Sequence, residues 1–238
     1  MEELVSKKQL ITVVGSGYVG MSLSVLLGKG SNHVKILEID KEKVKKINEG
    51  LSTVRDELIE EYISKEKLNI SATLDPEEAL NNGDYFIIAT PTNYDEKTNK
   101  FDTESVKSTI EKILTFSKNG SIIIKSTIPI GYTDYLKEKF KTDRIIFSPE
   151  FLREGNALYD NLYPSRIIMG DNSPAAVSFA EMLKKLSLKK STKIIYMSSR
   201  EAEAASSGSS AAKMATVTVA SRAAMRPRPP SRMPNARP

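Results

Sequence analysis

Short apolar runs alternate with amphipathic segments along the first 204 residues of the chain. Seven runs are mostly β-branched and flanked by turn residues, as buried strands are: residues 10–15, 33–39, 85–90, 121–127, 144–148, 166–170 and 192–197. Seven stretches between them have helical spacing: residues 18–29, 41–49, 56–65, 76–81, 103–116, 131–140 and 174–187. Strands and helices that alternate in this way predict right-handed β-α-β units, and hence an α/β fold with a doubly wound parallel sheet.

The last 34 residues, 205–238, have a different composition. They consist mainly of Ala, Ser, Arg, Pro and Met, and they contain no Leu, Ile or aromatic residue. Such a segment buries too little apolar surface to offset the entropy of ordering its chain. We therefore expect one folded domain over residues 1–204, followed by a basic low-complexity tail that is disordered.

The tail also accounts for the basic character of the chain, whose formal net charge is +5. Six of the 35 basic residues, and none of the 30 acidic ones, lie in residues 205–238. The first 204 residues therefore carry 29 basic and 30 acidic side chains, a net charge of −1. A nucleic-acid-binding function would have to rest on the tail, where the charges are scattered and no aromatic residue offers a stacking surface.

Cysteine is absent from the chain, and histidine occurs once. This composition excludes disulfides, zinc–thiolate sites and a catalytic thiol carried by these residues, and it suggests no metal site. No apolar run approaches the roughly 18 residues that a membrane helix needs, and the first residues lack a signal-peptide pattern. We therefore expect a cytoplasmic protein.

A glycine-rich turn, Gly15-Ser-Gly-Tyr-Val-Gly20, joins the first expected strand to the first expected helix. Gly15 permits a tight turn, Gly17 leaves room for a pyrophosphate against the backbone, and Gly20 allows the helix to pack closely on the strand. The free N–H groups at the start of the helix attract phosphate. The pattern therefore predicts a dinucleotide site.

Acidic residues lie at the end of the second expected strand, where such folds bind the adenosine ribose. Glu38 and Asp40 are both present, and side chains two apart on a strand share a face, so spacing does not choose between them. A carboxylate here accepts hydrogen bonds from the ribose hydroxyls and repels a 2′-phosphate, which favours NAD over NADP. The positive charges of Lys41 and Lys43 would weaken this discrimination.

Polar residues follow three further expected strands, at the edge of the sheet where doubly wound folds bind ligands. They are residues 89–93 (Ala-Thr-Pro-Thr-Asn), 125–127 (Lys-Ser-Thr) and 148–150 (Ser-Pro-Glu). Glu154 follows Glu150 at a spacing that puts both carboxylates on one face if the segment is helical. Such a pair beside a cofactor suits proton transfer or water activation, but Thr, Ser and Glu also serve as helix caps and surface partners of lysine.

Four segments together make the chain resemble the UDP-glucose/GDP-mannose dehydrogenase family over about residues 8–204. They are residues 13–23 (VVGSGYVGMSL), 89–95 (ATPTNYD), 125–133 (KSTIPIGYT) and 147–170 (FSPEFLREGNALYDNLYPSRIIMG). The last segment is the most specific, because a generic dinucleotide-binding fold has no need of it, and it points to the branch that acts on UDP-glucose. The resemblance implies a Rossmann-like NAD-binding domain.

The family resemblance also implies an activity. Its members oxidise a sugar C6 hydroxyl in two successive steps, each of which passes a hydride to NAD⁺. The implied substrate is UDP-glucose, the oxidants are two NAD⁺, and the product is UDP-glucuronate. In the family a cysteine holds the aldehyde stage as a thiohemiacetal, which is oxidised to a thioester and then hydrolysed.

Individual residues receive roles by the same resemblance. The cofactor-binding positions are Gly15, Gly17, Tyr18, Val19, Gly20, Glu38, Lys43, Thr92 and Thr127. By this match Glu38 is the ribose carboxylate, Lys43 lies near the adenosine, and Thr92 lies near the nicotinamide.

The catalytic candidates are Thr127, Glu150 and Glu154. Thr127 and Glu150 match the pair that positions the catalytic water, and Glu150 is the expected base in thioester hydrolysis. The segment from Glu150 through Phe151, Leu152, Arg153 and Glu154 matches the loop that contacts the sugar nucleotide.

The match to the family stops after residues 201–204 (Glu-Ala-Glu-Ala). Family members there begin a long central helix that carries a catalytic Lys and Asn and forms the core of a homodimer, and the nucleophilic Cys and the UDP-binding domain follow. Residues 205–238 instead have a bias that resembles out-of-frame translation. We therefore interpret the chain as a truncated or frameshifted form that binds NAD but is inactive alone; the alternative is a non-catalytic nucleotide-binding module.

Overall fold

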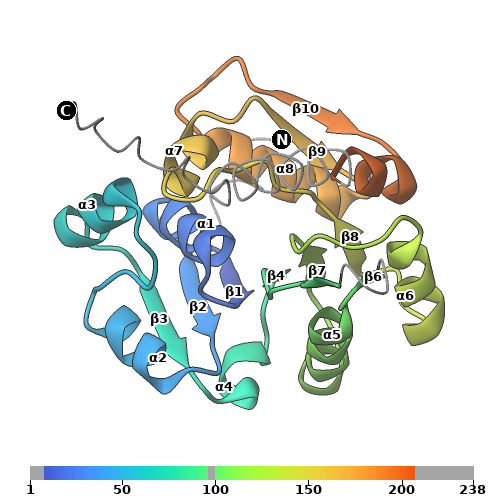
Figure 1. The fold of residues 1–238 in the computed structure, drawn as a ribbon, viewed down its shortest axis with the longest axis horizontal. Helices are drawn as coiled ribbons and strands as arrows, with labels where there is room; N and C mark the ends of the chain where they lie inside the picture. Colours follow the sequence, from blue (N-terminus) through green and yellow to red (C-terminus); the bar gives the residue numbers. More distant parts are fainter. Residues whose placement is uncertain (1–7, 96–99, 207–238) are drawn as a thin grey trace, which may run out of the picture.

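The computed structural model of the chain describes residues 8–95 and 100–206. In this part of the chain a parallel sheet is covered by helices on both faces (Figure 1). The six strands of the sheet are β1 (Leu10–Val14), β2 (His33–Leu37), β3 (Ile70–Thr73), β4 (Tyr85–Ile88), β7 (Ser121–Ile124) and β8 (Ile145–Phe147). The α/β fold with a doubly wound parallel sheet, expected from the sequence, is therefore confirmed.

The strand order of this sheet is β3-β2-β1-β4-β7-β8. β1 pairs with β2 on one side and with β4 on the other, so that Val14 lies opposite both Leu37 and Ile88. The chain therefore winds outward in both directions from β1. Doubly wound sheets bind ligands at this reversal, beyond the carboxyl ends of the central strands.

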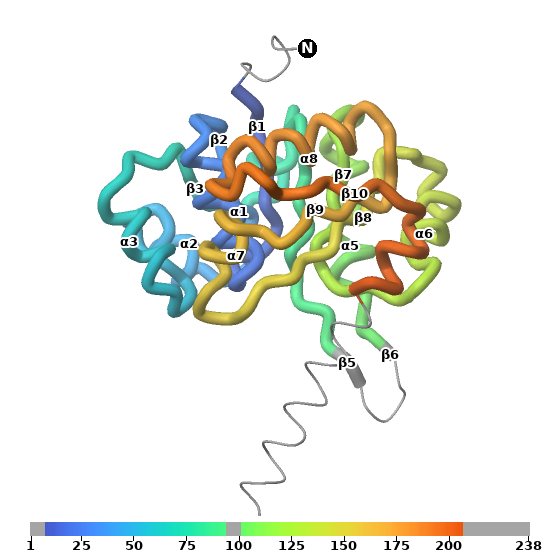
Figure 2. The backbone as a smooth tube through the Cα atoms, turned by 90° about the horizontal axis from the view of Figure 1, so that it is seen from above, coloured from blue at the N-terminus to red at the C-terminus, as the bar shows by residue number. Residues whose placement is uncertain are grey.

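Two smaller pairs of strands complete the structure. β9 (Arg166–Met169) and β10 (Lys193–Tyr196) form a separate parallel pair rather than further strands of the main sheet. A hydrogen bond from Gly170 N–H to the Phe147 carbonyl (2.8 Å) joins this pair to the end of β8. The short antiparallel strands β5 (Tyr94–Asp95) and β6 (Lys100–Phe101) project from the body of the molecule (Figure 2).

The sheet divides the apolar interior into two cores. The first core contains side chains from α1 (Tyr18–Lys29), α2 (Lys41–Asn48), α3 (Glu57–Lys65), α7 (Ala157–Leu162) and α8 (Pro174–Leu186). The second contains side chains from α4 (Pro76–Leu80), α5 (Glu104–Phe116) and α6 (Tyr132–Phe140). Along β4, Ile87 points into the first core, whereas Phe86 and Ile88 point into the second. Burial on both faces explains why the strands read as continuous apolar runs.

A last helix spans residues 199–206 and follows β10. Its buried Glu203 accepts hydrogen bonds from the Gly131 N–H (2.5 Å) and from the N–H (2.8 Å) and hydroxyl (2.6 Å) of Thr133, at the start of α6. A carboxylate at this point also suits the positive end of the helix dipole. The helix runs to residue 206, the domain boundary expected at residue 204 stays a prediction, and the expected tail from residue 207 onward lies outside the described residues.

No helix within residues 8–95 and 100–206 has both the length and the apolar character needed to cross a bilayer.

Candidate functional site

The turn between β1 and α1 is built around three glycines. Gly15 has a φ of +98°, and a Cβ there would lie 2.8 Å from the Ala89 carbonyl oxygen. A Cβ at Gly20 would lie only 2.0 Å from the Gly15 carbonyl oxygen but 3.5 Å, an ordinary contact distance, from Val13 of β1, so Gly20 is required by the turn itself rather than by the strand. A Cβ at Gly17, in contrast, would meet nothing within 4 Å.

Open space therefore lies beside Gly17, which is the N-cap of α1 and provides no side-chain cap. Tyr18 and Val19 follow as the first residues of the helix, and both are half-buried. Backbone N–H groups at the start of a helix, without a capping side chain, form an anion-binding site. The space and the donors fit the pyrophosphate of a dinucleotide.

Glu38 follows β2 directly and lies against the glycine turn, with only 7% of its surface exposed. Its carboxylate accepts hydrogen bonds from the N–H (3.0 Å) and hydroxyl of Ser16 and from the N–H of Ile39 (2.8 Å). Burial favours the neutral acid, but these hydrogen bonds and the positive charge of Lys43 outweigh it and lower the pKa of Glu38. Glu38 is therefore held ionised beside the turn.

Asp40 caps a helix and does not contact the glycine turn as Glu38 does. It is exposed, and its carboxylate caps α2 by accepting a hydrogen bond from the N–H of Glu42 (2.8 Å). Spacing alone left both residues as candidates for the ribose, whereas only Glu38 contacts the glycine turn. Between them, Ile39 is 93% exposed, which leaves an apolar surface that suits the flat face of an adenine. The sequence analysis gave Ile39 no role. Its place between Glu38 and Asp40 was the one feature of the sequence that could have drawn attention to it.

We expect Glu38 to make the stability of the fold depend on pH. Its pKa is lower in the folded chain than the value of about 4.3 expected when unfolded. The ionised carboxylate therefore stabilises the fold above that pH, and the contribution is lost as the pH falls through the folded pKa. Urea unfolding of the chain and of Glu38→Gln measures this: the difference in unfolding free energy should be largest near neutral pH and shrink below about pH 4. A difference that does not change with pH would contradict the expectation.

Thr92 and Thr127 lie on the loops that follow β4 and β7, and both are half-buried. The hydroxyl of Ser126 donates to the Thr90 carbonyl (2.6 Å), so the two loops are tied together. Because β4 and β7 are neighbours in the parallel sheet, both loops lie at the same edge as the glycine turn. The structure thus brings these two threonines to the crevice expected for the cofactor.

The segment after β8 differs from the helix that would pair Glu150 with Glu154. Residues 150–156 are not helical, and α7 begins only at Ala157. Gly155 adopts a φ of +78°, and Arg153 binds Asp160 through its N–H (2.9 Å) and its guanidinium (2.7 Å), which holds the segment as an irregular loop. The condition under which Glu150 and Glu154 would share a helical face is therefore not met.

Glu150 is half-buried and accepts a hydrogen bond from the Leu152 N–H (2.8 Å). Glu154 is exposed in a turn, and Arg153 is exposed and committed to Asp160. The ring of Phe151 lies 4.5 Å from the guanidinium carbon of Arg166. The loop thus presents Glu150 and Glu154 in different surroundings, so they are not an equivalent pair of carboxylates.

A pocket of about 270 Å³ lies beside this loop. Glu150, Phe151 and Leu152 line it from the loop, and Val19 lines it from α1. Glu154 is not among the described residues that form its wall. The pocket therefore lies between the start of α1, which follows the glycine turn, and the loop expected to contact the sugar.

Lys125 also lines this pocket, and sequence reasoning gave it no role of its own. It follows β7 and its three isoleucines directly and is only 7% exposed. Burial lowers the pKa of Lys125 to about 8, against the opposing effect of the negative charge of Glu150. In the sequence, the sign that Lys125 is buried was its place directly after a fully apolar run.

Comparison with known proteins shows a match over most of the chain. The family described as "UDP-glucose/GDP-mannose dehydrogenase family, NAD binding domain" matches residues 9–187. The chain is 48% identical over 201 residues to UDP-glucose 6-dehydrogenase of Streptococcus pneumoniae, and 46% identical over 194 residues to that of Campylobacter jejuni. These matches cover 82% and 81% of this chain but 51% and 49% of the relatives, so the chain spans about half the length of the curated relatives it matches.

Solved structures show the same fold. GDP-mannose dehydrogenase from Pseudomonas aeruginosa has a TM-score of 0.76 at 20% identity, over 89% of this chain and 51% of that one. At this identity the likeness concerns the fold alone. UDP-glucose dehydrogenase from Pyrobaculum islandicum has a TM-score of 0.74 at 25% identity, over 84% of this chain and 48% of that one.

Proposed function

Because the chain belongs to the UDP-glucose/GDP-mannose dehydrogenase family, with its NAD-binding domain at residues 9–187, we propose that it is the cofactor-binding part of an enzyme that oxidises UDP-glucose to UDP-glucuronate. The contact between the ionised Glu38 and the glycine turn carries the proposal, because it creates a ribose acceptor beside a pyrophosphate site. The relatives named UDP-glucose 6-dehydrogenase support the choice of sugar nucleotide.

The residues at the turn fit NAD in three respects. The space beside Gly17 takes the pyrophosphate, with the N–H groups of α1 as donors. Glu38 accepts hydrogen bonds from the adenosine ribose, Lys43 adds positive charge, and Ile39 lies under the adenine. Thr92 and Thr127 then flank the nicotinamide end of the same crevice.

NAD⁺ supplies the hydride acceptor when it is bound. The residues of this chain bind and orient it, and they handle protons at the sugar. One oxygen of Glu150 is held by the Leu152 N–H, which leaves the other oxygen to accept a proton from water or from a sugar hydroxyl. Thr127 orients that water, while Phe151, Leu152, Arg153 and Glu154 hold the sugar nucleotide. The chain has no cysteine, so its own residues do not provide the thiol that the family's reaction uses.

Titration calorimetry with NAD⁺ and with NADP⁺ tests the proposal. We expect NAD⁺ to bind at least about tenfold more tightly, or roughly 1.4 kcal/mol, because the charge of Glu38 repels a 2′-phosphate. Glu38→Gln should narrow this difference, whereas Glu42→Gln, an exposed change on α2, should preserve it. The absence of heat with NAD⁺, or equal affinities for both cofactors, would contradict the proposal.

The absence of cysteine favours one second candidate, a nucleotide-binding module without catalysis of its own. Both candidates bind NAD⁺, and formation of UDP-glucuronate by the purified chain separates them. A place in the cytoplasm is part of the first proposal and rests on the family resemblance. The same resemblance implies a homodimer for the family, but residues 205–238 do not match the helix that forms its core, so we do not propose dimer assembly for this chain.

A further inference from the structure

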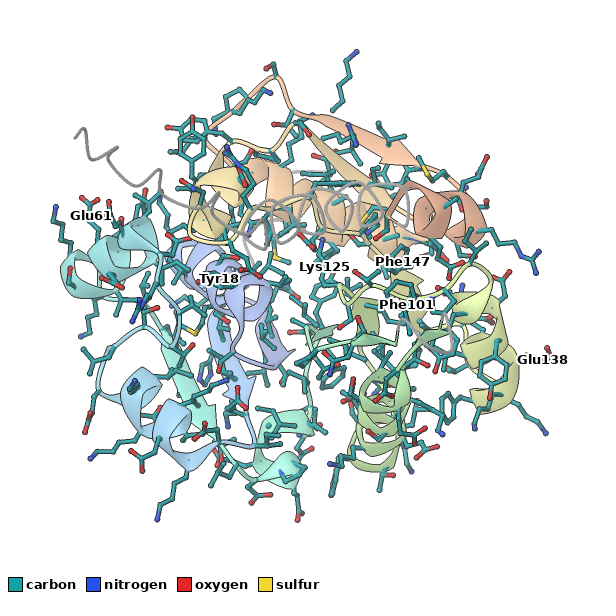
Figure 3. The ribbon with its side chains drawn as sticks, in the orientation of Figure 1. Tyr18, Glu61, Phe101, Lys125, Glu138 and Phe147 are labelled. Carbon is teal, nitrogen blue, oxygen red and sulfur yellow. The ribbon has the colours of Figure 1, made fainter. Side chains whose placement is uncertain are left out.

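Lys125 is the one lysine among the buried residues that the structure describes. Figure 3 labels it in the middle of the molecule, between Tyr18 of α1 and Phe147 of β8. The ion pairs of the described residues do not include Lys125. Removing an ammonium from water without a paired carboxylate is unfavourable. Polar and charged groups near Lys125 must therefore stabilise its positive charge.

The contacts of Lys125 lie on the segment that leads to Glu150. Its ammonium donates to the Ser148 hydroxyl (2.9 Å) and approaches the Pro149 carbonyl (3.5 Å). The Ser148 hydroxyl in turn donates to the Ile168 carbonyl of β9 (2.9 Å). Lys125 thus connects β7 to the end of β8, directly before Glu150, and indirectly to β9.

The charges around the pocket distinguish Glu150 from its neighbours. Lys125 and Glu150 line the same pocket, together with Asp160 from α7, Arg166 from β9 and Tyr163 from the loop between them. Asp160 is already paired with Arg153, at 2.7 Å. Glu150 is therefore the pocket carboxylate whose charge is left to balance the buried ammonium.

We propose that Lys125 is a positioning residue for Glu150: its ammonium holds the Ser148–Pro149 segment that leads to Glu150 and places a positive charge in the pocket that the Glu150 carboxylate also lines. The inference rests on the proposed function, in which Glu150 handles protons at the sugar. Without Lys125, the Ser148 hydroxyl oxygen and the Pro149 carbonyl lose the ammonium that donates to them, and the pocket that Glu150 lines loses a positive charge.

The titration of Lys125 itself tests the coupling. Lysine labelled with ¹³C at Cε gives one NMR signal per lysine, and the signal that disappears in Lys125→Arg is that of Lys125. We expect its midpoint near pH 8. In Glu150→Gln the midpoint should fall by about half a unit or more, because the negative charge that raises it is gone. Glu138→Gln, an equal change of charge on the outer side of α6 (Figure 3), should leave it unchanged.

Hydrogen exchange tests the positioning. The Leu152 amide donates to Glu150, so in Lys125→Met, an unbranched side chain one atom shorter and without the charge, it should exchange at least about tenfold faster. If Lys125→Met does not fold, the Lys125 titration midpoint in Glu150→Gln still tests whether Lys125 and Glu150 are coupled. The same midpoint in the chain and in Glu150→Gln, or a Lys125 midpoint at the ordinary value, would overturn the inference.

Calorimetry with NAD⁺ separates this inference from the proposed function. A chain that binds NAD⁺ but shows no coupling between Lys125 and Glu150 overturns the inference alone. A chain that shows the coupling but does not bind NAD⁺ supports the positioning contact and overturns the proposed function.

Discussion

Gly20→Ala should lower the free energy of unfolding by about 3 kcal/mol, the upper end of the usual range for overpacking. The new Cβ would lie 2.0 Å from the carbonyl oxygen of Gly15 and 2.9 Å from its carbon, which are both backbone atoms. They cannot move aside without opening the turn, because the Gly15 N–H is bound to the Leu37 carbonyl (2.9 Å). For a domain of this size we expect Tm to fall by roughly 6 to 12 °C, as measured by circular dichroism.

Gly17→Ala is the matched control, because it adds the same methyl group to the same turn. Its Cβ would meet nothing within 4 Å, so we expect a change in unfolding free energy of less than about 1 kcal/mol. The methyl group would instead occupy the space proposed for the pyrophosphate, and NAD⁺ affinity should fall by about tenfold or more. Equal Tm values for the two variants would show that the close approach at Gly20 is absent.

Glu203→Ala should also destabilise the fold, by about 3 kcal/mol. The fully buried carboxylate of Glu203 accepts hydrogen bonds from the Gly131 N–H and from both donors of Thr133. Alanine would leave these donors buried without their charged acceptor, and donors left without a partner account for the largest losses on substitution. Urea unfolding measures the loss, and faster hydrogen exchange of the Gly131 and Thr133 amides would locate it at the start of α6.

Glu201→Ala provides the control on the same helix. Glu201 is exposed, and its carboxylate accepts hydrogen bonds from the nearby Ser198, through the N–H (2.9 Å) and hydroxyl (2.7 Å). We expect this variant to lose less than about 1 kcal/mol, as surface substitutions usually do. Equal losses in the two variants would contradict the role given to Glu203.

The main elements were predictable because their signals are local and strong. Residues 122–124 are an apolar run buried on both faces, and residues 174–186 have helical spacing after a serine cap. β3 was missed because only Ala72 of its four residues is buried, so it has no apolar run. α7 was missed because six residues are too few to establish a helical period.

The site was predictable only in part, because contacts between distant segments decide it. The glycine turn is a local pattern, and its position before α1 follows from the sequence. The choice of Glu38 over Asp40 depends on how the turn lies against the end of β2, 22 residues away. The burial of Lys125 likewise depends on the ends of β8 and β9, which no spacing along the chain reports.

The division of the interior by the sheet has a thermodynamic consequence. Phe86 and Ile87 are neighbours in sequence, but they belong to different cores. Ile87 instead shares its core with Phe179 of α8, more than 90 positions away. Substitutions that share no packing partners have additive effects on stability, whereas those within one packed cluster do not. Through side-chain packing, Ile87 is therefore expected to couple more strongly to Phe179, 92 positions away, than to its sequence neighbour Phe86.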